Sequence, residues 1–178
     1  QGGFWIGTMG KAAEARAGTI WRWHRGELRP LVEGITIPNA ICFAADGRTA
    51  FYADTPTGMV WAQPLDGDGW PDGDRQLYLD LTPMGLSPDG AVIDSTGAFC
   101  VACWGDGAVL RLDASGAVLD RLAVGGRNAS CPAFGGADMR DLLVTTARQG
   151  IEDPDPAQGQ TWLVRAPAPG LTEPQVVL

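Results

Sequence analysis

A sequence pattern returns along this chain with a period of about 40 to 50 residues. In the first copy, Asn39 precedes a short apolar segment that ends near the turn glycine Gly47. Asp89 and Gly97 hold the same places in the second copy, and a looser third copy begins around Ser130. Each copy contains roughly four short apolar segments separated by turn dipeptides. Such repeats are typical of β-propeller blades, which stack around an axis because one sheet alone cannot bury both faces.

Glycine and proline set a further limit on the fold. The chain has 25 glycines and 13 prolines among 178 residues, and its longest segment without either is residues 137–149. Both residue types weaken or break helix interiors, so a helical bundle is excluded. A β-sandwich is the alternative, but it does not explain why Asn39 and Asp89 each lie eight residues before a turn glycine. We therefore predict an all-β chain with about four propeller blades.

Charge and hydropathy exclude two classes of partner. The net charge is −8, and the thirteen basic residues are spread along the chain rather than clustered. A protein of this kind does not attract phosphate backbones, so we expect no nucleic-acid partner. No apolar run approaches the ~20 residues of a membrane helix, so we expect no membrane partner either.

Two of the four cysteines, Cys100 and Cys103, form a C-x-x-C pattern that is compatible with zinc or redox chemistry. Their surroundings, however, indicate a buried strand, in which residues three apart point to opposite faces. One metal ion would not reach both sulfurs. We therefore expect reduced, structural cysteines, which fits a cytoplasmic chain.

The repeat also predicts a functional rim. The first strand of a blade lines the central channel, so Asn39, Asp89 and Ser130 are expected at equivalent places on three successive blades. An amide oxygen, a carboxylate and a hydroxyl that converge on an axis suit a hard cation. Asx and Ser residues before a strand also form local turns, so from periodicity alone both interpretations remain open.

Two other features carry less weight. His24 is the only histidine, which excludes a Ser-His-Asp triad, and we expect it at the surface of a strand. The segments Asp66–Gly69 and Asp72–Asp74 are similar to a calcium loop, but Trp70 stands where a ligand is needed. We expect solvated turns there.

Six short segments, in the same order, resemble the senescence marker protein, gluconolactonase and luciferin-regenerating-enzyme-like family. They are residues 3–9, 18–21, 37–39, 87–90, 101–104 and 133–136. The resemblance implies a six-bladed β-propeller that holds one divalent cation (Ca, Zn, Mg or Mn) and hydrolyses sugar lactones. It also implies a metal-polarised lactone carbonyl that is attacked by water.

Residue by residue, the resemblance implies that Asn39 and Asp89 are metal ligands. Asp89 also matches the family's general base, and Glu14 matches a polar substrate contact. We expect Ser130, the third rim residue, to contact the substrate as well. Ala40 departs from the family, which usually has glycine after the asparagine ligand.

The resemblance also predicts that residues 1–178 form a single propeller domain that is incomplete at its amino-terminal end. Exposed blade edges would then favour self-association. The expected small-molecule partner is a sugar lactone. The alternatives are a non-catalytic propeller that serves as a binding module and a phosphotriesterase-like hydrolase.

Overall fold

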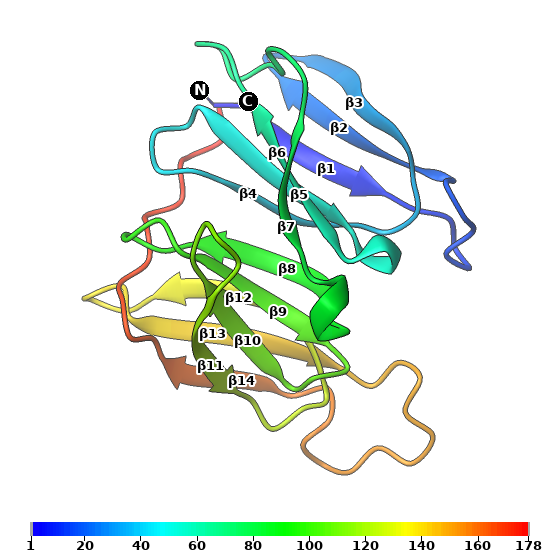
Figure 1. Ribbon diagram of the computed structural model, residues 1–178, viewed down its shortest axis with the longest axis vertical. Coiled ribbons are helices and arrows are strands. Elements are labelled where there is room, and N and C mark those ends of the chain that lie inside the picture. The colour runs from blue at the N-terminus through cyan, green and yellow to red at the C-terminus, as the bar shows by residue number, and fades with distance from the viewer. Residues whose placement is uncertain (1, 178) are drawn as a thin grey trace.

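The computed structural model describes residues 2–177, which form four antiparallel sheets (Figure 1). The first sheet contains β1 (Phe4–Thr8), β2 (Gly18–His24) and β3 (Glu27–Ile35), and the second contains β4 (Pro38–Phe43), β5 (Thr49–Asp54), β6 (Met59–Pro64) and β7 (Gln76–Asp80). The third contains β8 (Ser87–Ile93), β9 (Phe99–Trp104), β10 (Ala108–Leu112) and β11 (Val118–Ala123), and the fourth contains β12 (Asn128–Gly135), β13 (Asp141–Ala147) and β14 (Thr161–Arg165). The described helices are two single turns of 3-10 helix, η1 (Thr55–Thr57) and η2 (Thr82–Met84). The all-β prediction is confirmed.

The sheets follow one another in chain order, and within each sheet the strands pair with their neighbours in sequence. Strand β8, the first of its sheet, contacts both β4 and β12, the first strands of the sheets on either side. These three are therefore the inner strands of the arrangement. The number of blades in a complete ring stays a prediction.

Three apolar clusters hold the sheets together, each formed by the facing sides of two successive sheets. The largest lies between the second and third sheets, where Phe51 and Phe99 meet edge to face with ring centroids 6.0 Å apart. Cys103 belongs to this cluster, whereas Cys100 belongs to the next one, on the other face of β9. Both thiols are free and buried. The prediction that they point to opposite faces is confirmed.

The two terminal sheets each have one open face. On the last sheet, Leu143 and Leu163 pair across β13 and β14 and are 46% and 66% exposed. On the first sheet, Ile6 and Leu28 are 48% and 56% exposed. These are the exposed sheet faces expected of part of a ring, and self-association through them stays a prediction.

The carboxyl-terminal segment joins the last sheet back to the first. Gly170 N donates to Met139 O (2.6 Å), and Val177 N donates to Gly2 O (2.8 Å). In Figure 1 this segment is red and runs along one side of the molecule to the amino terminus. No helix of residues 2–177 is long and apolar enough to cross a membrane.

His24 is not at the surface, so that expectation was wrong. It is 9% exposed in β2, and the indole of Trp70 lies perpendicular to its ring at 6.2 Å. Trp70 reaches this position because its loop folds over β2. Within the loop, Asp66 Oδ1 accepts the backbone N–H groups of Asp68 (2.9 Å) and Trp70 (2.8 Å), which confirms that Asp66–Gly69 is a turn.

A buried ion pair fixes the turn between β8 and β9. Arg111 Nε, on β10, lies 2.5 Å from Asp94 Oδ2, and the Asp94 side chain is fully buried. Burial alone would raise the pKa of Asp94, but hydrogen bonds from Thr96, Arg111 and two backbone N–H groups lower it below its usual value. The ionised carboxylate therefore stabilises the fold.

We expect Phe99→Ala to lower the free energy of unfolding by about 3–5 kcal/mol, because it opens a cavity between the second and third sheets. Leu163→Ala, on the open face, should change it by less than about 0.5 kcal/mol. Urea unfolding monitored by tryptophan fluorescence measures both values. Equal losses in the two variants would contradict the assigned core.

Asp94 should also shape the acid side of the stability profile. Since its folded pKa lies below the unfolded value of about 3.9, its contribution is complete above that pH and is lost as pH falls through the folded pKa. Asp94→Asn should therefore be less stable at neutral pH and lose less stability on acidification. Thermal unfolding between pH 7 and pH 2 tests this, with exposed Asp153→Asn as the control. Parallel profiles for Asp94→Asn and the unchanged chain would disprove it.

Candidate functional site

The three inner strands depart from regular pairing at the predicted rim residues. The register shifts between Asn39 and Cys42 in β4, between Pro88 and Ala91 in β8, and between Ala129 and Cys131 in β12. Asp89 and Ser130 thus lie inside irregularities, and Asn39 borders one. β-bulges of this kind re-aim side chains and are common next to active sites.

Asn39 is held by a hydrogen-bonded relay to the neighbouring inner strand. Thr55 Oγ1 donates to Pro88 O (2.7 Å), and Asn39 Nδ2 donates to Thr55 Oγ1 (2.9 Å). A hydroxyl has a single proton to donate, and Thr55 uses it on Pro88. The amide nitrogen of Asn39 must therefore face Thr55, which leaves its carbonyl oxygen without a hydrogen-bond partner among residues 2–177.

Asp89 follows Pro88 directly and is half-buried. Desolvation by burial raises its pKa to about 6, against a smaller lowering by the backbone N–H of Gly90. Within residues 2–177, no arginine or lysine favours its ionised form. A half-buried carboxylate without a cationic partner fits a position beside a bound metal ion.

Gly90 sets the distance between β8 and β12. A Cβ atom at this position would lie 2.7 Å from Ser130 O and 2.9 Å from Cys131 Cα. The two backbones therefore approach more closely than any residue with a side chain would allow. Asp89, next to Gly90, thus lies near the start of β12, where desolvation and the charge of Asp89 both raise the pKa of Cys131.

Ser130 is engaged with its own sheet. Its hydroxyl lies 2.8 Å from Thr145 Oγ1 on β13, and Thr145 Oγ1 also accepts the backbone N–H of Cys131 at 3.1 Å. The hydroxyl retains capacity for a further hydrogen bond. A substrate contact by Ser130 is compatible with this arrangement and stays a prediction.

Glu14 lies in the exposed loop between β1 and β2, where its Oε2 accepts the backbone N–H of Ala12 at 3.1 Å. The same loop reaches the segment before β4, because Arg16 N donates to Thr36 Oγ1 at 3.1 Å. The loop between β1 and β2 therefore lies near the start of β4, where Asn39 is located. A substrate contact by Glu14 stays a prediction.

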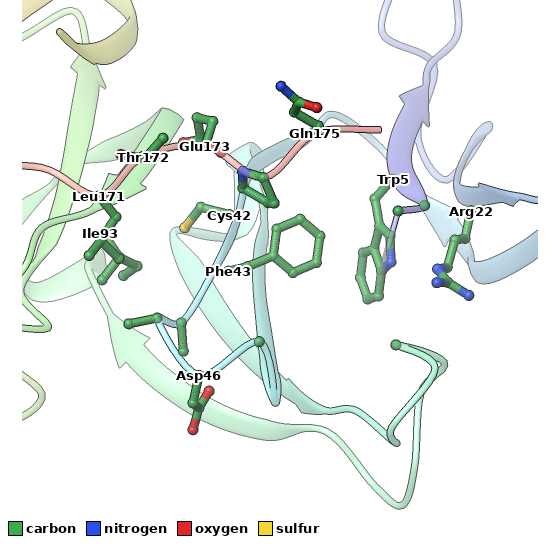
Figure 2. Close-up of a pocket in the computed structure, with 17 residues that line it drawn as sticks. Trp5, Arg22, Cys42, Phe43, Asp46, Ile93, Leu171, Thr172, Glu173 and Gln175 are labelled. Atoms are coloured by element: carbon green, nitrogen blue, oxygen red, sulfur yellow. The ribbon is translucent and has the colours of Figure 1, made fainter. Parts of the chain in front are cut away.

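A cavity lies elsewhere in the molecule. It has a volume of about 380 Å³ and lies between Phe43, Ile93 and Trp5, with Arg22 and the carboxyl-terminal segment at its margin (Figure 2). Phe43 and Ile93 end β4 and β8, whereas Asn39 and Asp89 lie near the beginnings of these strands. The predicted rim and this cavity are therefore at opposite ends of the inner strands.

The rim supplies only part of a metal site. Within residues 2–177, no three His, Cys, Asp or Glu side chains lie close enough together to hold a metal ion. This chain offers one carboxylate, from Asp89, and one free amide oxygen, from Asn39. Since calcium takes 6–8 oxygen ligands, the other ligands would be water, backbone or groups outside this chain.

Sequence reasoning missed the two threonines that support the rim, Thr55 and Thr145. Thr55 lies just beyond the end of β5, and Thr145 lies within β13 near its end, so each can reach back to the inner strand. The sequence feature that could have identified these threonines is their similar separation from the rim residue. Thr55 follows Asn39 by 16 residues, and Thr145 follows Ser130 by 15 residues.

We expect Thr55→Val to lower the free energy of unfolding by about 1–3 kcal/mol, because the half-buried Asn39 amide and the Pro88 carbonyl both lose their partner. Thr55→Ser keeps the hydroxyl and should recover most of this loss. Chemical unfolding of the two variants beside the unchanged chain is the measurement. A serine variant as unstable as the valine variant would show that the methyl group, not the relay, matters.

Comparisons with known proteins agree with this structure. The family model described as "SMP-30/Gluconolactonase/LRE-like region" matches residues 1–148. The 6-deoxy-6-sulfogluconolactonase of Pseudomonas putida is 34% identical over 181 aligned positions, which cover 97% of this chain and 61% of the relative. A pentonolactonase of Haloferax volcanii is 29% identical over 147 positions, which cover 82% of this chain and 50% of that protein.

The solved structures extend the likeness to three dimensions. A calcium-binding protein, regucalcin, from Agrobacterium tumefaciens strain C58 superposes with a TM-score of 0.95 at 39% identity, over 99% of this chain and 62% of that one. A luciferin-regenerating enzyme shares the fold, with a TM-score of 0.88 at 21% identity over 99% of this chain and 62% of that one. The chain thus spans about three fifths of the length of its first relatives. By the family match and these identities, the chain belongs to the SMP-30/gluconolactonase/LRE-like family.

Proposed function

We propose that the protein to which this chain belongs hydrolyses sugar lactones, with the aid of one divalent cation bound by Asn39 and Asp89. The observation that carries the proposal is the pair of oxygen donors at the bulges of β4 and β8. Asp89 is half-buried without a cationic partner, and the carbonyl oxygen of Asn39 is left free by its relay to Thr55. The lactonase names among the relatives support the reaction class.

The chain's own residues divide the remaining work. Asp89 would accept a proton from the attacking water, because it is the only carboxylate among the three rim residues. Ser130 and Glu14 would bind the hydroxyl groups of the sugar. Thr55 would hold Asn39 in position, so its role is structural.

A divalent cation bound at this rim would polarise the lactone carbonyl and stabilise negative charge on its oxygen. The identity of the cation depends on the whole ligand set, of which this chain supplies Asn39 and Asp89. Calcium is supported by the description of the Agrobacterium protein as a calcium-binding protein.

In the complete protein, we expect Asp89→Asn to lower the rate of gluconolactone hydrolysis by at least about 10²-fold, since the amide lacks both charge and basicity. Asn39→Asp should retain the metal and alter activity, because a carboxylate replaces a neutral oxygen donor. Calorimetric titration with Ca²⁺ and Mn²⁺ and a lactone-hydrolysis assay measure the two effects.

Asp74→Asn, an exposed carboxylate in the loop between β6 and β7, at the end of its sheet opposite Asn39, is the matched control and should change neither value. If Asn39 and Asp89 merely shape turns, Asp89→Asn should also be neutral, because asparagine serves equally well in such turns. An unchanged Asp89→Asn protein would end the metal-site proposal. Hydrolysis that continues after complete chelation would end metal dependence.

A further inference from the structure

Arg22 is a buried cation with unused hydrogen-bonding capacity. It lies on β2, is 2% exposed, and its guanidinium carbon is 4.1 Å from the centre of the Trp70 ring. Its Nη2 donates to the backbone oxygen of Asp68 at 2.6 Å. Its Nη1 is buried and has no hydrogen-bond partner within residues 2–177. A buried donor left without an acceptor costs free energy, so this position calls for a partner.

Nearby charges do not supply that partner. Burial lowers the pKa of Arg22, and Asp66 and Asp68 raise it from a distance without forming an ion pair among the described residues. The exposed Arg29 adds a further positive charge on the same indole, with its guanidinium carbon 4.5 Å from the ring centre. The guanidinium borders the 380 Å³ cavity beside Trp5, as Figure 2 shows.

The internal repeat indicates what the partner is. Arg22 pairs directly across from Trp5, and Arg111 pairs directly across from Cys100 in the third sheet. Trp5 and Cys100 both face the following sheet. Arg22 is therefore the counterpart of Arg111, whose partner is the buried carboxylate of Asp94.

The last sheet has a related but exposed set of ion pairs. There Arg165 on β14 binds Asp138, in the turn between β12 and β13, and also Asp141, directly across on β13. In both sheets, an arginine of the third strand thus binds a carboxylate from the turn between the first and second strands. By the same rule, the partner of Arg22 belongs to the turn that leads into β1.

The turn geometry fixes the position of this partner. Gly97, three residues before Cys100, has a left-handed backbone with φ of 83°, and Gly2, three residues before Trp5, has the same conformation with φ of 73°. Asp94 lies six residues before Cys100. The counterpart of Asp94 therefore falls six residues before Trp5, which is the second position before Gln1.

We propose that the cavity beside Arg22 receives the carboxylate of an Asp or Glu residue at the second position before Gln1, on a preceding segment of the same polypeptide. The curated relatives are long enough to contain such a segment, since this chain spans 60% and 61% of two of them. The occupant is a turn of the protein itself rather than a diffusible anion. This proposal does not depend on the lactonase function.

The first test is to read the codon at that position in the gene. Aspartate or glutamate supports the proposal, and any other residue, or a start of translation after that position, overturns it. The second test is a double-mutant cycle in the complete polypeptide, which combines Arg22→Gln with the Asp→Asn or Glu→Gln change. The two changes should be coupled by about tenfold or more in the unfolding equilibrium constant.

Two reference measurements make the cycle decisive. The pair Arg111→Gln and Asp94→Asn should show coupling of the same sign, because that ion pair is present in the structure. Arg29→Gln, which removes the exposed arginine from the same indole, should show none with the upstream residue. Additive effects for Arg22, within twofold, would overturn the proposal even if the upstream residue is acidic.

A titration with inorganic phosphate distinguishes the upstream carboxylate from the alternative occupant, a free anion. If the site is filled by the upstream carboxylate, phosphate should not raise the thermal midpoint of the complete polypeptide in a way that depends on Arg22. A rise that disappears in Arg22→Gln would identify a free anion site and overturn the proposal. Arg22→Lys keeps the charge and should fold where Arg22→Gln does not, so the cycle can be repeated with it.

Discussion

A β-sheet that is apolar on both faces must be covered on both faces, and this requirement organises the whole chain. Strand β9 meets it most completely: five of its six residues, Phe99–Cys103, are buried, since sheets lie on either side. The terminal sheets meet it on one face only, which is why Leu163 is 66% exposed while Phe99 is fully buried. Radial stacking of sheets is the arrangement that satisfies this constraint repeatedly.

The candidate site depends on the places where this regularity fails. Regular pairing would alternate side chains between the two faces of each sheet and send none of them toward a common axis. The irregularities at Asn39, Asp89 and Ser130 redirect the chain at the start of each inner strand. The close approach at Gly90 then brings β8 and β12 together, and Thr55 joins β4 to β8. The rim is thus a product of packing between sheets, not of any one sheet.

The sequence predicted the features that depend on local pattern. The equivalent placement of Asn39 and Asp89 and the opposite faces of Cys100 and Cys103 follow from the spacing of turn glycines and from strand alternation. It did not predict the burial of His24, because the cover comes from Trp70, 46 residues later in the sequence. The same limit hid Thr55 and the unused nitrogen of Arg22. Contacts between distant segments leave no periodic signal in the sequence.

Ala40 shows how a departure from the family pattern is accommodated. Its φ of 54° lies in the left-handed region, where a residue with a Cβ atom costs roughly 1–2 kcal/mol relative to glycine. The alanine methyl group is 1% exposed and packs in the cluster between the second and third sheets, which returns about 0.8 kcal/mol. Alanine also loses less backbone entropy on folding than glycine does. These effects nearly offset one another, so the bulge can keep its shape and Asn39 its direction. For a β-branched residue at position 40, burial would not offset the backbone cost, because the second branch at Cβ makes the left-handed conformation a genuine outlier.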